Sequence, residues 1–149
     1  MTYSIRGIIE GIAAKIASFC SYPIYISPTQ QSCTPPCFFI CLMPGNLKDE
    51  IDNRYYTTLN IDVVFLQNPN IVNASDGIIS VLENLDLTLD TISYTENSST
   101  ITMYTYDRKH HLENMDLHYQ LTFHARLMKS EVHTYMKTLT EAVYVENKN

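Results

Sequence analysis

The stretch 53–67, NRYYTTLNIDVVFLQ, decides the fold of this chain. From Thr58 to Leu66 apolar and polar side chains largely alternate, and a period of two is typical of a strand with one buried face. The predicted inward face consists of Leu59, Ile61, Val63 and Phe65, and the other face of Thr58, Asn60, Asp62 and Val64. The stretch therefore predicts a long strand that packs one face on a core.

A second run, residues 117–128 (LHYQLTFHARLM), repeats this alternation. One face carries Leu117, Tyr119, Leu121, Phe123, Ala125 and Leu127, and the other carries His118, Gln120, Thr122, His124 and Arg126. Strands of globular proteins usually have about 5–6 residues, so both runs are long. We predict that they form the centre of one curved, mainly antiparallel sheet.

Two stretches have the spacing of amphipathic helices. The first covers residues 4–19, with Ser4 as N-cap and with Gly7 and Gly11 at a close approach to another backbone. The second covers residues 74–84 and is capped by Asn73. Its predicted inward residues are Ile78, Ile79, Leu82 and Leu85.

The remaining segments complete an α+β fold, in which a mixed, mainly antiparallel β-sheet is flanked by the N-terminal amphipathic helix and the second helix. Further strands are predicted at residues 22–27 near an edge, 37–43 with both faces covered, 88–95 and 100–106, with a turn at 96–99. Loops are predicted at residues 44–52 and 107–116. Residues 1–149 are predicted to form one domain. Its last ~20 residues could be an extended C-terminal arm, with a helical turn at 132–140 and a strand at 142–145.

The net charge of −6 argues against a duplex nucleic-acid binder, which would need a basic face. Between Arg54 and Arg108 there is no Lys or Arg. The same span contains seven acids: Asp62, Asp76, Glu83, Asp86, Asp90, Glu96 and Asp107. These acids form either a solvated surface or a surface that repels DNA or meets a basic partner.

The N-terminal segment has no continuous apolar core of the signal-peptide type, because Arg6, Glu10 and Lys15 interrupt it. The longest uncharged apolar run, residues 37–43, is far shorter than the ~20 residues that span a bilayer. We therefore expect synthesis in the cytoplasm and no membrane partner.

Four cysteines, Cys20, Cys33, Cys37 and Cys41, lie in the first third of the chain. Their spacing lacks the CxxC pair of a zinc site, and a disulfide framework is not expected in a reducing compartment. Cys37 and Cys41 share one face of the predicted strand, where a thiol acts as a small hydrophobic group.

The sequence shows no catalytic motif. It has only four glycines, no phosphate-binding loop, no GxSxG elbow and no HExxH. His110 and His111 are adjacent, so on a strand they would point to opposite faces, and His118 and His124 are about 20 Å apart along a strand. The predictions are no catalytic residue, no cofactor, no metal ligand and no enzymatic activity.

Several of the 11 tyrosines cluster at predicted strand ends. Tyr and Arg are enriched in the cores of protein interfaces, although Tyr is also a routine strand residue. Long strands also expose edges that recruit other chains, and a head-to-tail ring would cover such edges. A protein that works through its surface is therefore favoured.

Three motifs carry a resemblance to a known family. They are PCFFI (36–40), NRYYTTLNIDVVF (53–65) and LHYQLTFHARL (117–127), in an order that also includes the N-terminal helix, an acidic helix and a hairpin. Over about residues 4–130 the chain resembles the tail terminator family of Gram-positive phages and of phage-tail-like bacteriocins. The resemblance implies a homo-hexameric ring that caps the tail tube, halts its polymerisation and offers a docking surface to the head connector. In a contractile tail the ring would also anchor the sheath protein.

The resemblance also implies contact residues, which we predict from it together with the strand faces. They are Arg54, Tyr55, Tyr56, Tyr104, Tyr106, His118, His124 and Arg126. The acid-only span would then line a lumen that does not trap DNA. The alternatives are a head–tail joining or neck protein of the same particle and, ranked lower, a cytoplasmic small-ligand module or enzyme.

Overall fold

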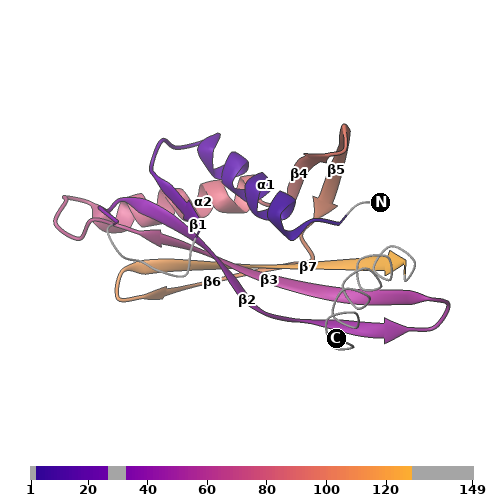
Figure 1. The fold of residues 1–149 in the computed structure, drawn as a ribbon. Coiled ribbons are helices and arrows are strands. Elements are labelled where there is room, and N and C mark those ends of the chain that lie inside the picture. The colour runs from indigo at the N-terminus through magenta and orange to yellow at the C-terminus, as the bar shows by residue number, and fades with distance from the viewer. Residues whose placement is uncertain (1–2, 27–32, 129–149) are drawn as a thin grey trace, which may run out of the picture.

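The computed structural model describes residues 3–26 and 33–128. Its elements are α1 (Ile5–Ala17), β1 (Ile24–Ile26), β2 (Cys37–Glu50), β3 (Arg54–Leu66), α2 (Ala74–Thr88), β4 (Thr91–Glu96), β5 (Ser99–Tyr104), β6 (Asp107–Glu113) and β7 (Asp116–Met128). Five strands form a sheet in the order β1-β2-β3-β7-β6, in which only β1 and β2 are parallel. Both helices and the separate β4–β5 hairpin lie on one side of this sheet (Figure 1). The predicted α+β class is confirmed.

The two alternating runs pair with each other at the centre of the sheet, as predicted. β3 and β7 run antiparallel from Arg54 opposite Met128 to Leu66 opposite Asp116. All ten predicted inward side chains of the two strands are buried. All but Leu127 share one core cluster with the fully buried α1 residues Ile8, Ile12 and Ile16 and with Ile78 and Leu85 of α2. Burial of this apolar surface is the main stabilising contribution to the fold.

Helix α1 starts where the sequence predicts, because the Ser4 hydroxyl accepts a hydrogen bond from the Gly7 N–H at 2.9 Å. The predicted close approach to a backbone is found at Gly11, where a Cβ would lie 2.8 Å from the carbonyl oxygen of Ser93. At Gly7 the neighbour is instead the ring of Tyr94. Both glycines therefore let α1 lie directly on β4.

Three details predicted for the second helix are wrong. The helix continues to Thr88, the Asn73 side chain makes no capping bond, and Ile79 is exposed. The helix is longer because Leu85 and the following Leu89 are both fully buried, so packing holds its last turn. As a consequence β4 begins only at Thr91.

The loop predicted at residues 44–52 is mostly strand, because β2 extends to Glu50. One extra residue is accommodated between Met43 and Asn46, which pair with Asn60 and Thr58 respectively. This bulge contains Pro44, which has no N–H to donate, and Gly45, where a Cβ would clash with the Thr58 carbonyl oxygen. The sequence signals of a turn therefore mark a bulge within a longer strand.

The loop predicted at residues 107–116 is the strand β6 followed by a tight turn into β7. The two turn residues, Asn114 and Met115, have positive φ angles of 51° and 69°, which suit a two-residue hairpin. All seven residues of β6 are exposed. Because neither face of β6 is buried, its sequence has no alternation that would reveal a strand.

The structure also corrects the expectation that no disulfide forms. Cys33 and Cys37 are bonded, because the bend at residues 35–36 brings them together just before β2. Cys20 and Cys41 remain thiols. Cys37, Phe39 and Val64 form a small buried cluster with Cys41 packed against it, on the side of the sheet away from the helices, so both faces of β2 are covered at its start, as predicted.

The elements predicted at residues 132–140 and 142–145 lie outside the described residues. Within the described part of the chain, no helix is long and apolar enough to cross a membrane.

Candidate functional site

The face of the five-stranded sheet that points away from α1 and α2 is called here the open face. Since β3 and β7 bury alternate residues in the core, their other residues lie on this face. Its central positions are Tyr56, Thr58, Asn60 and Asp62 on β3, and His118, Gln120, Thr122, His124 and Arg126 on β7. Side-chain hydrogen bonds cross it, from the Thr122 hydroxyl to Asn60 Oδ1 at 2.8 Å and between Thr58 Oγ1 and His124 Nδ1 at 3.1 Å.

Four of the eight predicted contact residues meet on the open face, and they are called here the His124 cluster: Tyr56, Tyr106, His124 and Arg126. The His124 ring stacks on Tyr56 at 5.1 Å and receives the Tyr106 ring edge-on at 4.1 Å. The Arg126 guanidinium lies 5.2 Å from the Tyr56 ring centroid and donates from Nε to Glu50 at 3.0 Å. This hydrogen bond to Glu50 raises the pKa of Arg126 further above its ordinary value, so its charge is fixed.

The structure does not bring the other four predicted residues into this cluster. Arg54 lies two residues before Tyr56 on the same strand face, whereas Tyr55 points to the opposite face. Tyr104 is exposed at the end of β5, in the separate two-stranded sheet. His118 lies six residues along β7 from His124. All eight remain predictions as contact residues.

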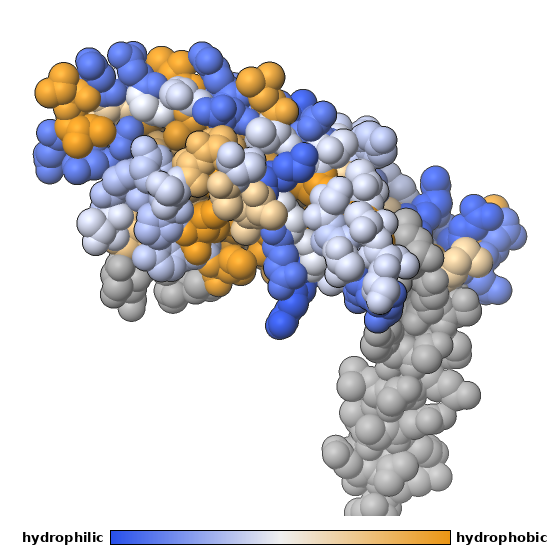
Figure 2. All heavy atoms as spheres, turned by 90° about the horizontal axis from the view of Figure 1, so that it is seen from above, coloured by the Kyte–Doolittle hydropathy of each residue, from blue (hydrophilic) through white to orange (hydrophobic). Residues whose placement is uncertain are grey.

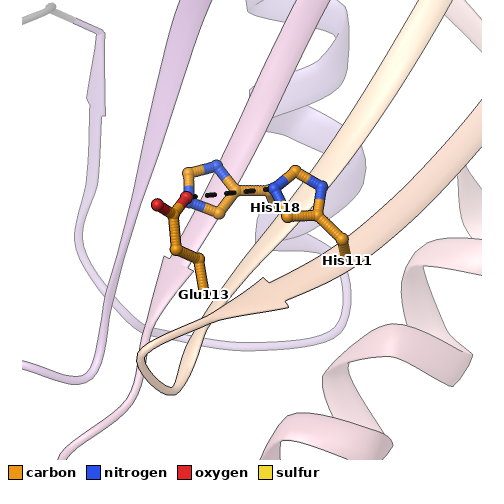
Figure 3. A group of neighbouring side chains, drawn as sticks. All are labelled: His111, Glu113 and His118. Atoms are coloured by element: carbon orange, nitrogen blue, oxygen red, sulfur yellow. Dashed lines mark ion pairs between the residues drawn. The ribbon is translucent and has the colours of Figure 1, made fainter.

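His118 belongs to a second group of polar side chains at the other end of the open face. Its Nδ1 lies 2.8 Å from Asp62 Oδ2, and its ring stacks parallel to that of His111 at 4.8 Å. Glu113 lies beside both rings (Figure 3). The sequence did not reveal Asp62 or Glu113 as neighbours of His118, because residues 107–116 were predicted to be a loop and Asp62 lies 56 positions from His118.

At one end the sheet narrows to three strands, called here the arm: residues 42–50 of β2, 54–61 of β3 and 122–128 of β7. β1 pairs only with Phe38–Ile40 of β2. β6 pairs with β7 from Asp116 to Thr122 and no further toward Met128. Within residues 3–26 and 33–128, no strand therefore pairs with the outer edges of β2 at 42–48 or of β7 at 123–128. The arm projects beyond the helices (Figure 1) and exposes Leu42 and Leu47, and Ile51 is exposed in the turn that joins its strands β2 and β3.

The side of the molecule that carries α1 and α2 has a mixed apolar and polar surface, unlike the polar open face. Seen from this side, apolar patches alternate with polar ones toward the end that holds the loop before α2 (Figure 2). Exposed apolar residues on α2 and this loop are Ile71, Val72, Ile79 and Leu87. A shallow hollow between α1 and β1 is lined by Ile5, Arg6, Ile9, Glu10 and Ile26. The hollow is open to solvent, and four of its five lining residues come from α1. It therefore does not resemble an enclosed ligand pocket.

An open polar sheet face, with strand edges that no described strand pairs with, indicates a protein that works by contacting other chains. Its sequence matches the family model described as "Phage tail terminator protein" over residues 7–135, which is most of its length. The chain belongs to the phage tail terminator family, and is thus a structural protein of the phage tail.

One solved structure similar to this chain is described as "Virion of native gene transfer agent (GTA) particle". The similarity covers 85% of this chain and 99% of that chain, with 14% sequence identity and a TM-score of 0.40. No curated protein matches the sequence. The resemblance stated from the three motifs is confirmed by the family match.

Proposed function

We propose that six copies of this chain form a closed ring on the end of the tail tube and stop its polymerisation. The far side of the ring then presents the surface on which the head connector docks in a phage. In a contractile tail the ring also holds the last ring of the sheath. These statements are more specific than the structural role in the phage tail that follows from the family match.

The observation that carries this proposal is the arm with its two different open edges. The β2 edge and the β7 edge lie on opposite sides of the arm, so a contact between them joins two subunits head-to-tail. Head-to-tail contacts close into rings when the rotation between subunits permits it. Unpaired N–H and C=O groups on such edges, together with exposed Leu42 and Leu47, favour pairing with another chain.

The His124 cluster lies on the arm and supplies side chains suited to the same contact. Tyr and Arg combine apolar area with hydrogen-bonding groups, and they are common among the residues that dominate binding energy. The Arg126–Glu50 pair is solvent-exposed and is therefore worth little within one subunit. Its placement beside the Tyr56 ring makes it a candidate for burial against a neighbouring copy.

The acidic residues support a distinct role for the α2 side. Four of the seven acids of the span without Lys or Arg are exposed on α2 or just after it: Asp76, Glu83, Asp86 and Asp90. If this side lines the lumen, its charge repels the DNA that passes through a phage tail. A ring structure that places these four residues on the outer rim would refute this role of the α2 side.

The mechanism is a difference in affinity. The ring must bind the exposed end of the tube more tightly than another ring of tube protein does. Its opposite side must lack the surface that the next tube ring would recognise. Termination then needs no chemical step and no energy source, because it is a property of two unlike faces of one ring.

The experiment measures assembly and tube growth together. Native mass spectrometry of the purified chain is expected to show a hexamer, and adding it to growing tail tube protein is expected to shorten the tubes. Arg126→Ala changes the arm and is expected to weaken ring formation. Arg6→Ala changes an exposed residue of α1 and is expected to leave ring formation unchanged. A chain that stays monomeric at high concentration and leaves tube length unchanged refutes the proposal.

A further inference from the structure

The β6–β7 hairpin gathers two imidazoles and one carboxylate at a single point. The two-residue turn at Asn114–Met115 fixes the register, so that His111 lies directly opposite His118 and Glu113 opposite Asp116. Residues opposite each other in an antiparallel pair share one face, as do residues two apart on one strand. His111, Glu113 and His118 therefore project together from the open face (Figure 3).

The distances among these groups are close to those of a metal site. One ligand atom from each residue lies within 4.8 Å of the other two. Glu113 Oε2 is 3.7 Å from His118 Nε2 and 4.0 Å from His111 Nε2. Ligand atoms in a tetrahedral zinc site with bonds of about 2.0–2.1 Å are about 3.3 Å apart. The rings of His111 and His118 stack parallel at 4.8 Å, so their in-plane lone pairs do not point to one place as they stand. His111 and Glu113 are exposed, and both side chains would rotate to bring their ligand atoms to one ion.

His118 is already oriented by a second carboxylate. Its Nδ1 lies 2.8 Å from Asp62 Oδ2, and both side chains are mostly buried. When the neutral ring donates its Nδ1 proton to Asp62, the lone pair is left on Nε2, on the side of Glu113. A carboxylate behind a histidine in this way fixes the tautomer and the ring orientation of metal-binding histidines.

Within residues 3–26 and 33–128, the ion pairs of Asp62 and Glu113 are with the histidines of this group, and none is with a Lys or Arg. Lys109, on the same face of β6, pairs with Asp107 at 3.7 Å instead. The carboxylates of Glu113 and Asp62, with Asp116 opposite Glu113 in the hairpin, place negative charge around the two histidines. A bound cation at this point would therefore be favoured by the local charge.

We propose that His111, Glu113 and His118 bind a zinc-class divalent ion, with Asp62 as the positioning residue behind His118. Two imidazoles and one carboxylate suit Zn²⁺ and its neighbours in the transition series, whereas Mg²⁺ prefers oxygen ligands alone. The fourth position is left for water or for a side chain of another tail protein. The ion would tie β6, an edge strand exposed at all seven positions, to the central strand β7.

This site lies within one subunit, so it does not depend on ring formation. It also differs from the sequence expectation of no metal ligand, which considered His110 with His111 and His118 with His124. Neither of those pairs can share an ion, but the pair His111 and His118 was not visible until β6 was known to be a strand.

The test is zinc titration of the full chain after removal of any affinity tag, followed by calorimetry and by competition with a chromophoric chelator. We expect one ion per chain, a Kd in the micromolar range, and no competition from Mg²⁺. His111→Gln is expected to weaken binding at least about tenfold, and Asp62→Asn about 10–100-fold. His110→Gln is the matched control, since this exposed histidine is adjacent on the same strand but points to the other face.

Two further readouts distinguish this site from zinc binding by a cysteine thiolate or by scattered surface groups. Co²⁺ in place of Zn²⁺ should give a tetrahedral visible spectrum without the thiolate charge-transfer band that Cys20 or Cys41 would produce. Hydrogen exchange at residues 107–113 should slow on adding Zn²⁺ to the wild type and to His110→Gln, and remain unchanged in His111→Gln. Equal zinc affinity of the two glutamine variants, or a thiolate band, overturns the proposal.

Discussion

The hydrogen bond between Tyr119 and Asp86 provides a quantitative test of the packing between β7 and α2. The Tyr119 side chain is fully buried, and its hydroxyl donates to Asp86 Oδ1 at 2.6 Å. Tyr119→Phe keeps the ring in place and removes the interactions of the hydroxyl with Asp86 and with Arg108. Hydrogen bonds to charged groups contribute about 1.5–3 kcal/mol. Because Asp86 is exposed and water can replace the lost partner, we expect a loss near the lower limit, about 1.5 kcal/mol at pH 7.

The same hydroxyl should make the effect depend on pH. Burial, followed by the hydrogen bond and the charge of Asp86, raises the pKa of Tyr119 above its ordinary value of 10.0. The folded protein therefore keeps a proton that the unfolded chain loses above about pH 10. The Tyr119 contribution to wild-type stability should fall by about 1.4 kcal/mol per pH unit in that range, and the variant has no such loss. The deficit of the variant should therefore shrink to nearly zero at about pH 11.

The assay is urea denaturation of both proteins at pH 7, 9, 10 and 11, at one fixed protein concentration, because assembly would add to apparent stability. Tyr3 and Tyr94 also have raised pKa values, from burial first, but both proteins contain them and their effects cancel. Tyr25→Phe, at an exposed tyrosine outside the predicted contact residues, is the control and should follow the wild type throughout. A deficit of Tyr119→Phe that stays constant from pH 7 to 11 refutes the reasoning.

Three further substitutions test the bulge, the core and the helix start. Gly45→Ala places a methyl group against the Thr58 carbonyl oxygen and should lower the unfolding free energy, measured with denaturant, by about 1–3 kcal/mol. Lys48→Ala, at an exposed position of the same strand, is the control and should lower it by less than about 0.5 kcal/mol. Phe38→Ala removes a fully buried ring and should lower the unfolding free energy by about 3–5 kcal/mol, and a loss below about 1 kcal/mol contradicts its place in the core. Ser4→Ala deletes the α1 cap and should cost about 1 kcal/mol, with Ser4→Asp restoring it, as read from thermal melts.

Part of the candidate site follows from local alternation alone. The period of two along β3 and β7 places Tyr56, His118, His124 and Arg126 on the face opposite the core, and the structure confirms that orientation. The same rule places Tyr55 on the other face. A strand's own sequence can predict these faces, because burial of one side constrains every second residue.

The partners of these residues could not be predicted in the same way. Glu50 reaches Arg126 across 76 positions, and Tyr106 packs on His124 from the connection between β5 and β6. The first contact depends on the extension of β2 through residues predicted to be a loop, and the second on the pairing of β6 with β7, where a loop was also predicted. β6 has no buried face, and β2 passes through a proline-containing bulge, so neither shows the periodicity by which strands are recognised.

The sequence by itself determined the class of fold, the two central strands with their buried faces, and the family resemblance that the family match confirms. Only the tertiary structure decided which open-face residues meet, because register between strands is set by a bulge and by a tight turn. One extra residue at Pro44–Gly45 and positive φ angles at Asn114–Met115 establish those registers. A shift of one residue at either place would send every side chain beyond it to the opposite face, so contacts between distant residues cannot be derived from local periodicity.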